Sequence, residues 1–116
     1  IPNPIVLTGD IHSNWVNDLK LDFDRPDERT VATEFVCTSL SSGGNGTRTP
    51  KNLDKLLAEN PFVKFHNAER GYTSCTVTPD SLKSDYQVVE YVDQPGAPLV
   101  TRASFVVENG RPGVAG

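Results

Sequence analysis

Apolar and polar residues along the chain follow mainly the two-residue alternation that is typical of β-strands. An apolar run at residues 4–8 ends at Gly9-Asp10, which predicts a short buried strand that meets a turn. Residues 30–41 carry apolar side chains on both faces, as a strand in the centre of a sheet does. Further strands are expected at residues 62–65, 72–78, 84–92 and 100–108.

One segment departs from this alternation and predicts a helix. Thr49-Pro50 offers a capping residue followed by a proline at the first helical position. Leucines then recur at helical spacing, and Asn60-Pro61 predicts the end of the helix. Residues 17–30 are polar and acidic, and we expect a solvent-exposed loop there, with a turn of helix near residues 16–21.

These elements together predict an α+β fold, a β-rich mixed or antiparallel sheet layer with one main helix. Residues 72–78 and 84–92 are expected to form a hairpin through Pro79-Asp80. One helix covers only one face of such a layer, so a partner is expected on the other face. The partner would be the rest of a longer chain, such as a missing N-terminal segment, or a second copy in a homo-oligomer.

Length and charge narrow the function classes. The 116 residues suggest a single domain, and the net charge of −4 with no basic face argues against binding nucleic acid through its phosphates. No apolar run approaches the roughly 20 residues of a membrane-spanning helix. The opening residues 1–4 lack the charged start of a signal peptide, so none is expected within this sequence.

Two cysteines, Cys37 and Cys75, both fall in predicted strands. Two small buried side chains are the first interpretation. A disulfide, if the protein is exported, and a reactive or metal-binding thiol are the alternatives, although no paired cysteine spacing supports the last.

The candidate chemistry lies where the first predicted strand ends. Gly9 permits a sharp turn, and Asp10 offers carboxylate oxygens that suit hard cations. His12 could bind a metal or donate a proton, and Asn14 could bind a metal through its oxygen or a phosphate through its NH2 group. Trp15 could form a wall of such a site. A plain turn, with Asp10 capping backbone amides and His12 exposed, explains the pattern equally well.

Several motifs, in order, resemble the alkaline phosphatase D (PhoD-like) family. The first is the late metal-site motif of that family, Val6-Leu7-Thr8-Gly9-Asp10-Ile11-His12-Ser13-Asn14-Trp15. The others are Thr33-Glu34-Phe35-Val36, Thr38-Ser39-Leu40-Ser41-Ser42-Gly43-Gly44, Arg70-Gly71-Tyr72 with Thr76-Val77-Thr78-Pro79, Asp85-Tyr86-Gln87-Val88-Val89, and residues 101–113. The resemblance covers nearly the whole chain.

The resemblance implies a secreted or cell-envelope (periplasmic) metallophosphatase that hydrolyses phosphomonoesters and phosphodiesters. Residues 1–116 would be the C-terminal part of one catalytic domain, the C-terminal half of an α/β-β/α sandwich. The family binds calcium and iron, and its metals supply a metal-activated oxygen nucleophile. Asp10 matches a metal ligand, to calcium, and His12 matches a position beside the bound phosphate as ligand or proton donor.

Most metal ligands of that family precede this motif, and this sequence does not contain them. We therefore expect the isolated chain to be inactive. The alternative is a non-catalytic β-rich module that self-associates, while a generic β-sandwich binding domain leaves residues 9–15 unexplained.

Three further residues have a structural and a functional interpretation. His66 and Asn67 lie where related phosphoesterases place a histidine pair, which is absent here. Asn67 is therefore expected to form hydrogen bonds within a loop. Arg70 could contact a phosphate, but a structural salt bridge is the favoured interpretation.

Overall fold

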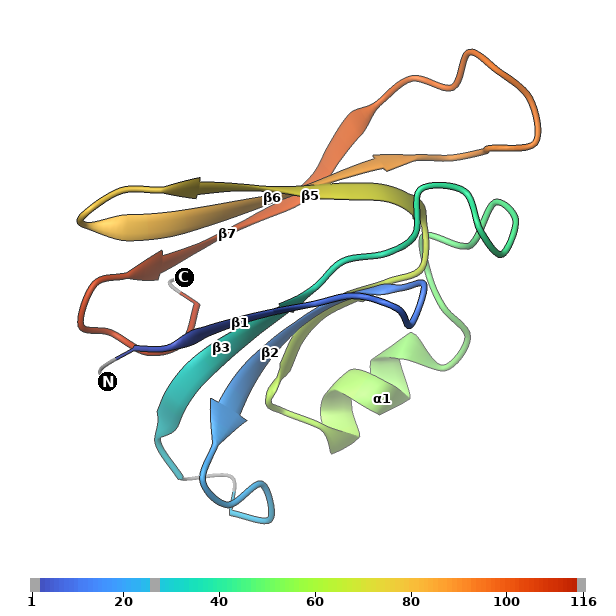
Figure 1. Ribbon diagram of the computed structural model, residues 1–116. Helices are drawn as coiled ribbons and strands as arrows, with labels where there is room; N and C mark the ends of the chain where they lie inside the picture. Colours follow the sequence, from blue (N-terminus) through green and yellow to red (C-terminus); the bar gives the residue numbers. More distant parts are fainter. Residues whose placement is uncertain (1–2, 26–27, 115–116) are drawn as a thin grey trace.

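The computed structural model describes residues 3–25 and 28–114, which form two facing β-sheets and one short helix (Figure 1). The first sheet has the strand order β1 (Ile5–Thr8), β3 (Thr30–Val36), β2 (Asn14–Lys20), β4 (Val63–Asn67). The second has the order β5 (Arg70–Val77), β6 (Ser81–Val89), β7 (Val100–Glu108), and the helix is α1 (Leu53–Glu59). The predicted β-rich fold with one main helix is confirmed, but the strands divide into two sheets where one layer was expected.

The largest error of the sequence interpretation concerns β2. Residues 17–30 were expected to form an exposed acidic loop, with a turn of helix near residues 16–21. Both expectations are wrong for residues 16–20, because Asn14–Lys20 is a strand between β3 and β4, antiparallel to both. Its inward positions include Asn14 and Asp18, both buried polar residues, so the strand shows no apolar alternation. Asp18 is not solvated; it pairs with Lys64 Nζ at 3.7 Å. Residues 26–27 of the expected loop lie outside the described residues.

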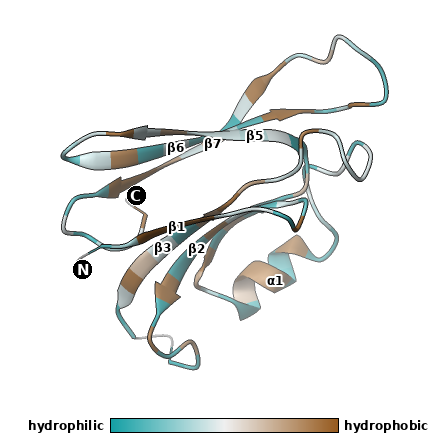
Figure 2. Ribbon diagram, viewed as in Figure 1, coloured by the Kyte–Doolittle hydropathy of each residue, from teal (hydrophilic) through white to brown (hydrophobic). Residues whose placement is uncertain are grey.

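The first strand, β1, is an edge strand and not the buried strand that its apolar run suggested. Of the strands in the described residues it pairs only with β3, to which it runs parallel. Its Leu7 side chain is 62% exposed. Figure 2 shows β1 as one of the most hydrophobic strands of the molecule, although it lies at the sheet edge.

The strand predicted at residues 30–41 is confirmed in part as β3, which lies between β1 and β2 but ends at Val36. The predicted helix is confirmed, but it begins at Leu53, and Asn52 with φ 62° takes the N-cap position expected for Thr49. Asn60 ends it as predicted, because its backbone and side-chain nitrogens both donate to the Leu56 carbonyl. No residue of α1 is buried, since the helix only flanks β4 on the outer side of the first sheet (Figure 1).

The second sheet matches the sequence interpretation closely. The expected hairpin is β5 and β6, which pair from Arg70 with Val89 to Val77 with Leu82. The third strand, β7, pairs with β6 on its other side. This sheet covers the inner face of the first one, the face for which the sequence suggested a partner from outside. The expectation of such a partner stays a prediction.

A small core joins the two sheets. Val16 and Phe35 from the first sheet pack with Tyr86 and Val107 from the second. The Tyr86 hydroxyl also donates to the Trp15 carbonyl oxygen at 2.9 Å, which links the sheets through a hydrogen bond. Burial raises the pKa of Tyr86, so this hydroxyl keeps its proton and remains a donor.

Cys37 and Cys75 are both free thiols, one half-buried and the other exposed. The interpretation as two buried side chains is therefore wrong for Cys75. No helix among the described residues is long and apolar enough to cross a membrane.

Candidate functional site

The segment that the sequence singled out connects β1 to β2, passing the end of β3. Residues 10–13 form bends, and Ile11 N donates to the Gly9 carbonyl at 3.0 Å. Asp10 has φ 76° and His12 has φ 63°, two left-handed conformations within three residues. The left-handed region costs most L-residues roughly 1–2 kcal/mol, although Asp, like Asn, reaches it more readily, and unusual backbone conformations concentrate at functional sites. Local backbone preference alone does not explain this loop, so contacts elsewhere must hold it.

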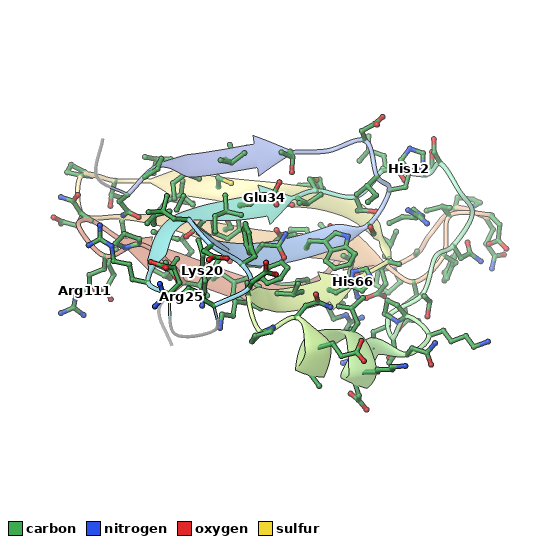
Figure 3. The ribbon with its side chains drawn as sticks, turned by 90° about the horizontal axis from the view of Figure 1, so that it is seen from below. His12, Lys20, Arg25, Glu34, His66 and Arg111 are labelled. Atoms are coloured by element: carbon green, nitrogen blue, oxygen red, sulfur yellow. The ribbon has the colours of Figure 1, made fainter. Side chains whose placement is uncertain are left out.

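The Asp10 and His12 side chains are both exposed. Within residues 3–25 and 28–114 no hydrogen bond or ion pair engages either of them. The turn alternative, in which Asp10 caps backbone amides, therefore has no contact to support it among the described residues. Figure 3 shows His12 and His66 at the same end of the molecule, away from Arg25 and Arg111.

Asn14 occupies a different environment, with only 1% of its surface exposed. Its Oδ1 accepts a hydrogen bond from the Thr38 backbone at 3.0 Å, and its Nδ2 donates to Asn67 Oδ1 at 3.1 Å. The amide thus joins β2 to the end of β3 and to β4. A contact between Asn14 and substrate stays a prediction, and it depends on the second hydrogen of Nδ2.

Asn67 is hydrogen-bonded as expected, but it is the last residue of β4 and not part of a loop. Besides its bond with Asn14, its Nδ2 donates to Glu69 Oε1 at 2.8 Å. The Glu69 carboxylate also pairs with Arg102 Nε at 2.8 Å. A chain of buried polar groups therefore runs from the candidate loop into the second sheet.

His66 lies against Trp15, with ring centroids 3.6 Å apart and an angle of 25° between the planes. Its Nδ1 is 3.3 Å from the Asn14 carbonyl oxygen, which can only accept, so Nδ1 carries the proton. Nε2 is then left with its lone pair. The His66 ring borders a cavity of about 340 Å³ beside α1, and Trp15 is not among the residues that line this cavity.

The stability of the protein is expected to fall with acidification because of His66. Burial lowers the pKa of His66 from 6.5, and the hydrogen bond to Asn14 opposes this only in part. The unfolded chain therefore binds a proton at a higher pH than the folded chain does. The stabilisation is complete above about pH 6.5 and is lost as the pH falls toward the lower folded-state pKa.

The measurement is urea unfolding between about pH 7.5 and about pH 5. His66→Phe keeps an aromatic ring on Trp15 and should lose less stability over this range than the unmodified chain. Trp15 is the single tryptophan of the sequence, so its fluorescence reports the stack directly. Equal losses in the two proteins would contradict the assignment.

The expected salt bridge of Arg70 is wrong. Arg70 is 5% exposed, and within residues 3–25 and 28–114 its guanidinium donates only to backbone carbonyls and hydroxyls, among them the carbonyl of His12. Sequence analysis missed this contact with the candidate loop. No group of three or more His, Cys, Asp or Glu side chains gathers anywhere in the described part of the chain.

Comparison with known proteins places these features in a family. The family model described as PhoD-like phosphatase matches residues 1–86. Alkaline phosphatase D of Bacillus subtilis (strain 168) is 46% identical over 112 residues, which cover 97% of this chain and 19% of that protein. A solved structure, "Structure of PhoD", superposes with a TM-score of 0.89 at 45% identity, over 96% of this chain and 21% of that one. The chain thus spans about a fifth of the length of these relatives, and it belongs to the PhoD-like phosphatase family.

Proposed function

We propose that this chain is the C-terminal part of a single catalytic domain of a metal-dependent phosphatase that hydrolyses phosphomonoesters and phosphodiesters. Family membership supports the phosphatase assignment. In this proposal the two facing sheets correspond to the C-terminal half of an α/β-β/α sandwich. Since the chain matches only 19% of its relative, the remaining parts of the catalytic site would come from other segments of the natural protein.

The observation that carries the proposal is the state of Asp10 and His12. Both side chains are exposed and have no partner in residues 3–25 and 28–114, although the backbone that carries them is strained. Charged and titratable groups held in strained loops at strand ends are typical of active sites. The structural alternative of a capped turn would use Asp10 locally, which it does not.

The donor set fits calcium only in part. The Asp10 carboxylate is a hard oxygen ligand, free to bind, and a calcium ion takes 6–8 such oxygens. No further cluster of acidic or histidine side chains stands in the described residues, so this chain would contribute one ligand to a larger calcium and iron centre. When bound, the cations would stabilise charge on the phosphoryl oxygens and activate the attacking oxygen.

His12 would act at the leaving group. Its exposed imidazole could hold a proton and give it to the alkoxide oxygen as the phosphorus–oxygen bond breaks, so that a neutral alcohol departs. The same ring could donate a hydrogen bond to a phosphoryl oxygen in the bound state. The proposal gives Asn14 a supporting part, because its amide fixes the start of β2, two residues after His12.

The substrate class and the cellular location are also proposed from membership of the family. A phosphate ester would be the substrate, and a secreted or cell-envelope (periplasmic) location is proposed for the natural protein.

The 116-residue chain by itself is expected to release no phosphate, because one carboxylate and one histidine cannot hold a polynuclear metal site. The purified chain should be assayed with calcium and iron on p-nitrophenyl phosphate and bis-p-nitrophenyl phosphate. The natural protein under the same conditions is the positive control. Metal-dependent turnover by the purified chain would contradict the expectation if the His12→Asn variant loses that turnover.

A non-catalytic module that self-associates is the second candidate. The edge strands β1 and β5 favour it, since Leu7 is 62% exposed and Val77 is 72% exposed. Both candidates expect an inactive isolated chain. They differ in the natural protein, where only the first requires Asp10 and His12 for turnover.

A further inference from the structure

The most extensive side-chain contacts around the candidate loop come from Arg70, the first residue of β5. Its Nη1 donates to the His12 carbonyl at 2.6 Å, and its Nε donates to the Gly44 carbonyl at 2.9 Å. Nη1 also lies 3.1 Å from the Thr38 and Ser39 hydroxyls. One buried guanidinium therefore joins the loop at residues 9–13 to the segment at residues 38–46.

These contacts hold the backbone of His12 in its unusual conformation. His12 has φ 63°, and its side chain has no partner among the described residues. The bond from Arg70 to the His12 carbonyl is the shortest contact that ties this residue to the rest of the structure. Because rotation of that peptide would break it, the bond fixes the direction from which the imidazole leaves the backbone.

Gly43 leaves space between the guanidinium and the imidazole. A Cβ atom at Gly43 would stand 3.3 Å from Arg70 Nη2 and 3.8 Å from His12 Nδ1. The two basic groups thus face one small region that a side chain at position 43 would fill. Gly43 also has φ +88°, so the glycine meets both a backbone and a steric requirement.

The hydrogen-bond acceptors of Arg70 in the described part of the chain are all neutral. A buried cation without an anionic partner is costly, and hydrogen bonds to neutral oxygens offset this only in part. The positive charge of Arg70, next to the candidate loop, is therefore not neutralised by an anionic side chain among the described residues. A positive charge there favours an anion in front of the loop, which agrees with a phosphate ester as substrate.

We propose that Arg70 is the positioning residue of His12: it holds the loop at residues 9–13 so that the imidazole is presented to the phosphate ester. The inference rests on the proposed function, since it assigns His12 to the reaction. Arg70 does not touch the substrate in this assignment. It acts through the His12 carbonyl, and a lysine cannot replace it, because one ammonium group cannot reach both segments with the same fork.

A double-mutant cycle in the natural protein tests this. Arg70→Lys is expected to lower kcat by about 100-fold with a smaller change in KM, as for a misplaced catalytic group. His12→Asn removes the imidazole and tolerates the left-handed conformation. In the His12→Asn background, Arg70→Lys should change kcat by no more than about twofold, because the group it positions is gone.

A matched control separates positioning from loss of stability. Val107→Ala is a core change far from the loop in the fold, at a residue that is 2% exposed. It should lower the melting temperature and keep kcat, whereas Arg70→Lys should lower kcat at temperatures where both proteins are folded. Hydrogen exchange of the amides at residues 11–13, followed by mass spectrometry, should accelerate in Arg70→Lys and not in Val107→Ala.

Each outcome decides the proposal. Full additivity of the two changes, or loss of bound metal in Arg70→Lys, would show that Arg70 does not act through His12. An unchanged kcat in His12→Asn would reject the proposed function of His12, while hydrogen exchange would still decide whether Arg70 holds the loop. If Arg70→Lys does not fold, Gly43→Ala takes its place in the cycle, and additivity with His12→Asn overturns the proposal in the same way.

Discussion

Replacing Asp10 with Asn in the natural protein is expected to lower calcium affinity and phosphatase activity together, each by about 100-fold or more. Loss of a partner that only supports a metal ligand already costs about 10–100-fold in metal affinity or activity, so loss of the ligand itself should cost at least as much. A factor of 100 corresponds to about 2.7 kcal/mol of binding free energy. The reason lies in the exposed carboxylate, which has no other partner among the described residues.

The choice of asparagine separates charge from backbone strain. Asp10 has φ 76°, a conformation that Asn adopts readily and Ala does not. Asp10→Ala should therefore lose the same activity and some stability in addition. Asp24→Asn is the matched control, because Asp24 is an exposed aspartate that directly precedes Arg25 in the sequence, and Figure 3 shows Arg25 away from His12. Wild-type calcium content and activity in Asp10→Asn would rule out the metal assignment.

The strands that the sequence predicts well are those with apolar side chains at most of their buried positions. In β6, Tyr86 and Val88 point inward two residues apart, and the two-residue pattern is plain. The strand β3 has Phe35 and Val36 buried on opposite faces, as a central strand requires. Here burial and hydrophobicity agree, so alternation predicts the element and its place.

The failure at β2 has a physical cause. Its buried positions Asn14 and Asp18 are stabilised by hydrogen bonds and an ion pair with residues far away in the sequence. The pattern of residues within this segment gives no sign of these distant partners. The sequence of the segment therefore resembles that of an exposed acidic loop. The prediction for β1 errs in the opposite sense. Its apolar run suggests burial, but among the described residues the strand has a neighbouring strand on one side only.

The candidate site also has one part that the sequence predicts and another that it does not. Asp10 and His12 were identified because their chemistry and spacing lie within one short motif. The contacts of Arg70 with the candidate loop could not be found from the sequence, since its acceptors include the carbonyls of His12 and Gly44, and carbonyls are common to all residues. The one available signal was the density of glycines at positions 43, 44 and 46, which marks a close backbone approach.

Gly46→Ala is expected to destabilise the chain by about 3 kcal/mol or more, against about 1–2 kcal/mol for Gly44→Ala. The two glycines have similar backbone conformations, with φ +69° and +76°. They differ in their surroundings. A Cβ at Gly46 would stand 1.8 Å from the Ala68 carbonyl oxygen, whereas a Cβ at Gly44 would meet nothing within 4 Å.

The contact at Gly46 cannot relax cheaply. The Ala68 carbonyl accepts a hydrogen bond from Thr47 N at 3.2 Å, and Ala68 N donates to the Thr47 carbonyl at 2.9 Å. Moving the carbonyl away from a methyl group would break this pair of bonds. It would also shift the start of β5, two residues after Ala68, where Arg70 begins its contacts with the candidate loop.

Urea unfolding of the 116-residue chain, followed through Trp15 fluorescence, measures both variants against the unmodified chain. The left-handed backbone contributes to both losses, so the difference between them isolates the steric contact with Ala68. Equal losses would mean that the segment at residues 43–46 adapts freely. In that case the Arg70 contacts could not hold His12 in one orientation, and the loop would owe its conformation to other parts of the natural protein.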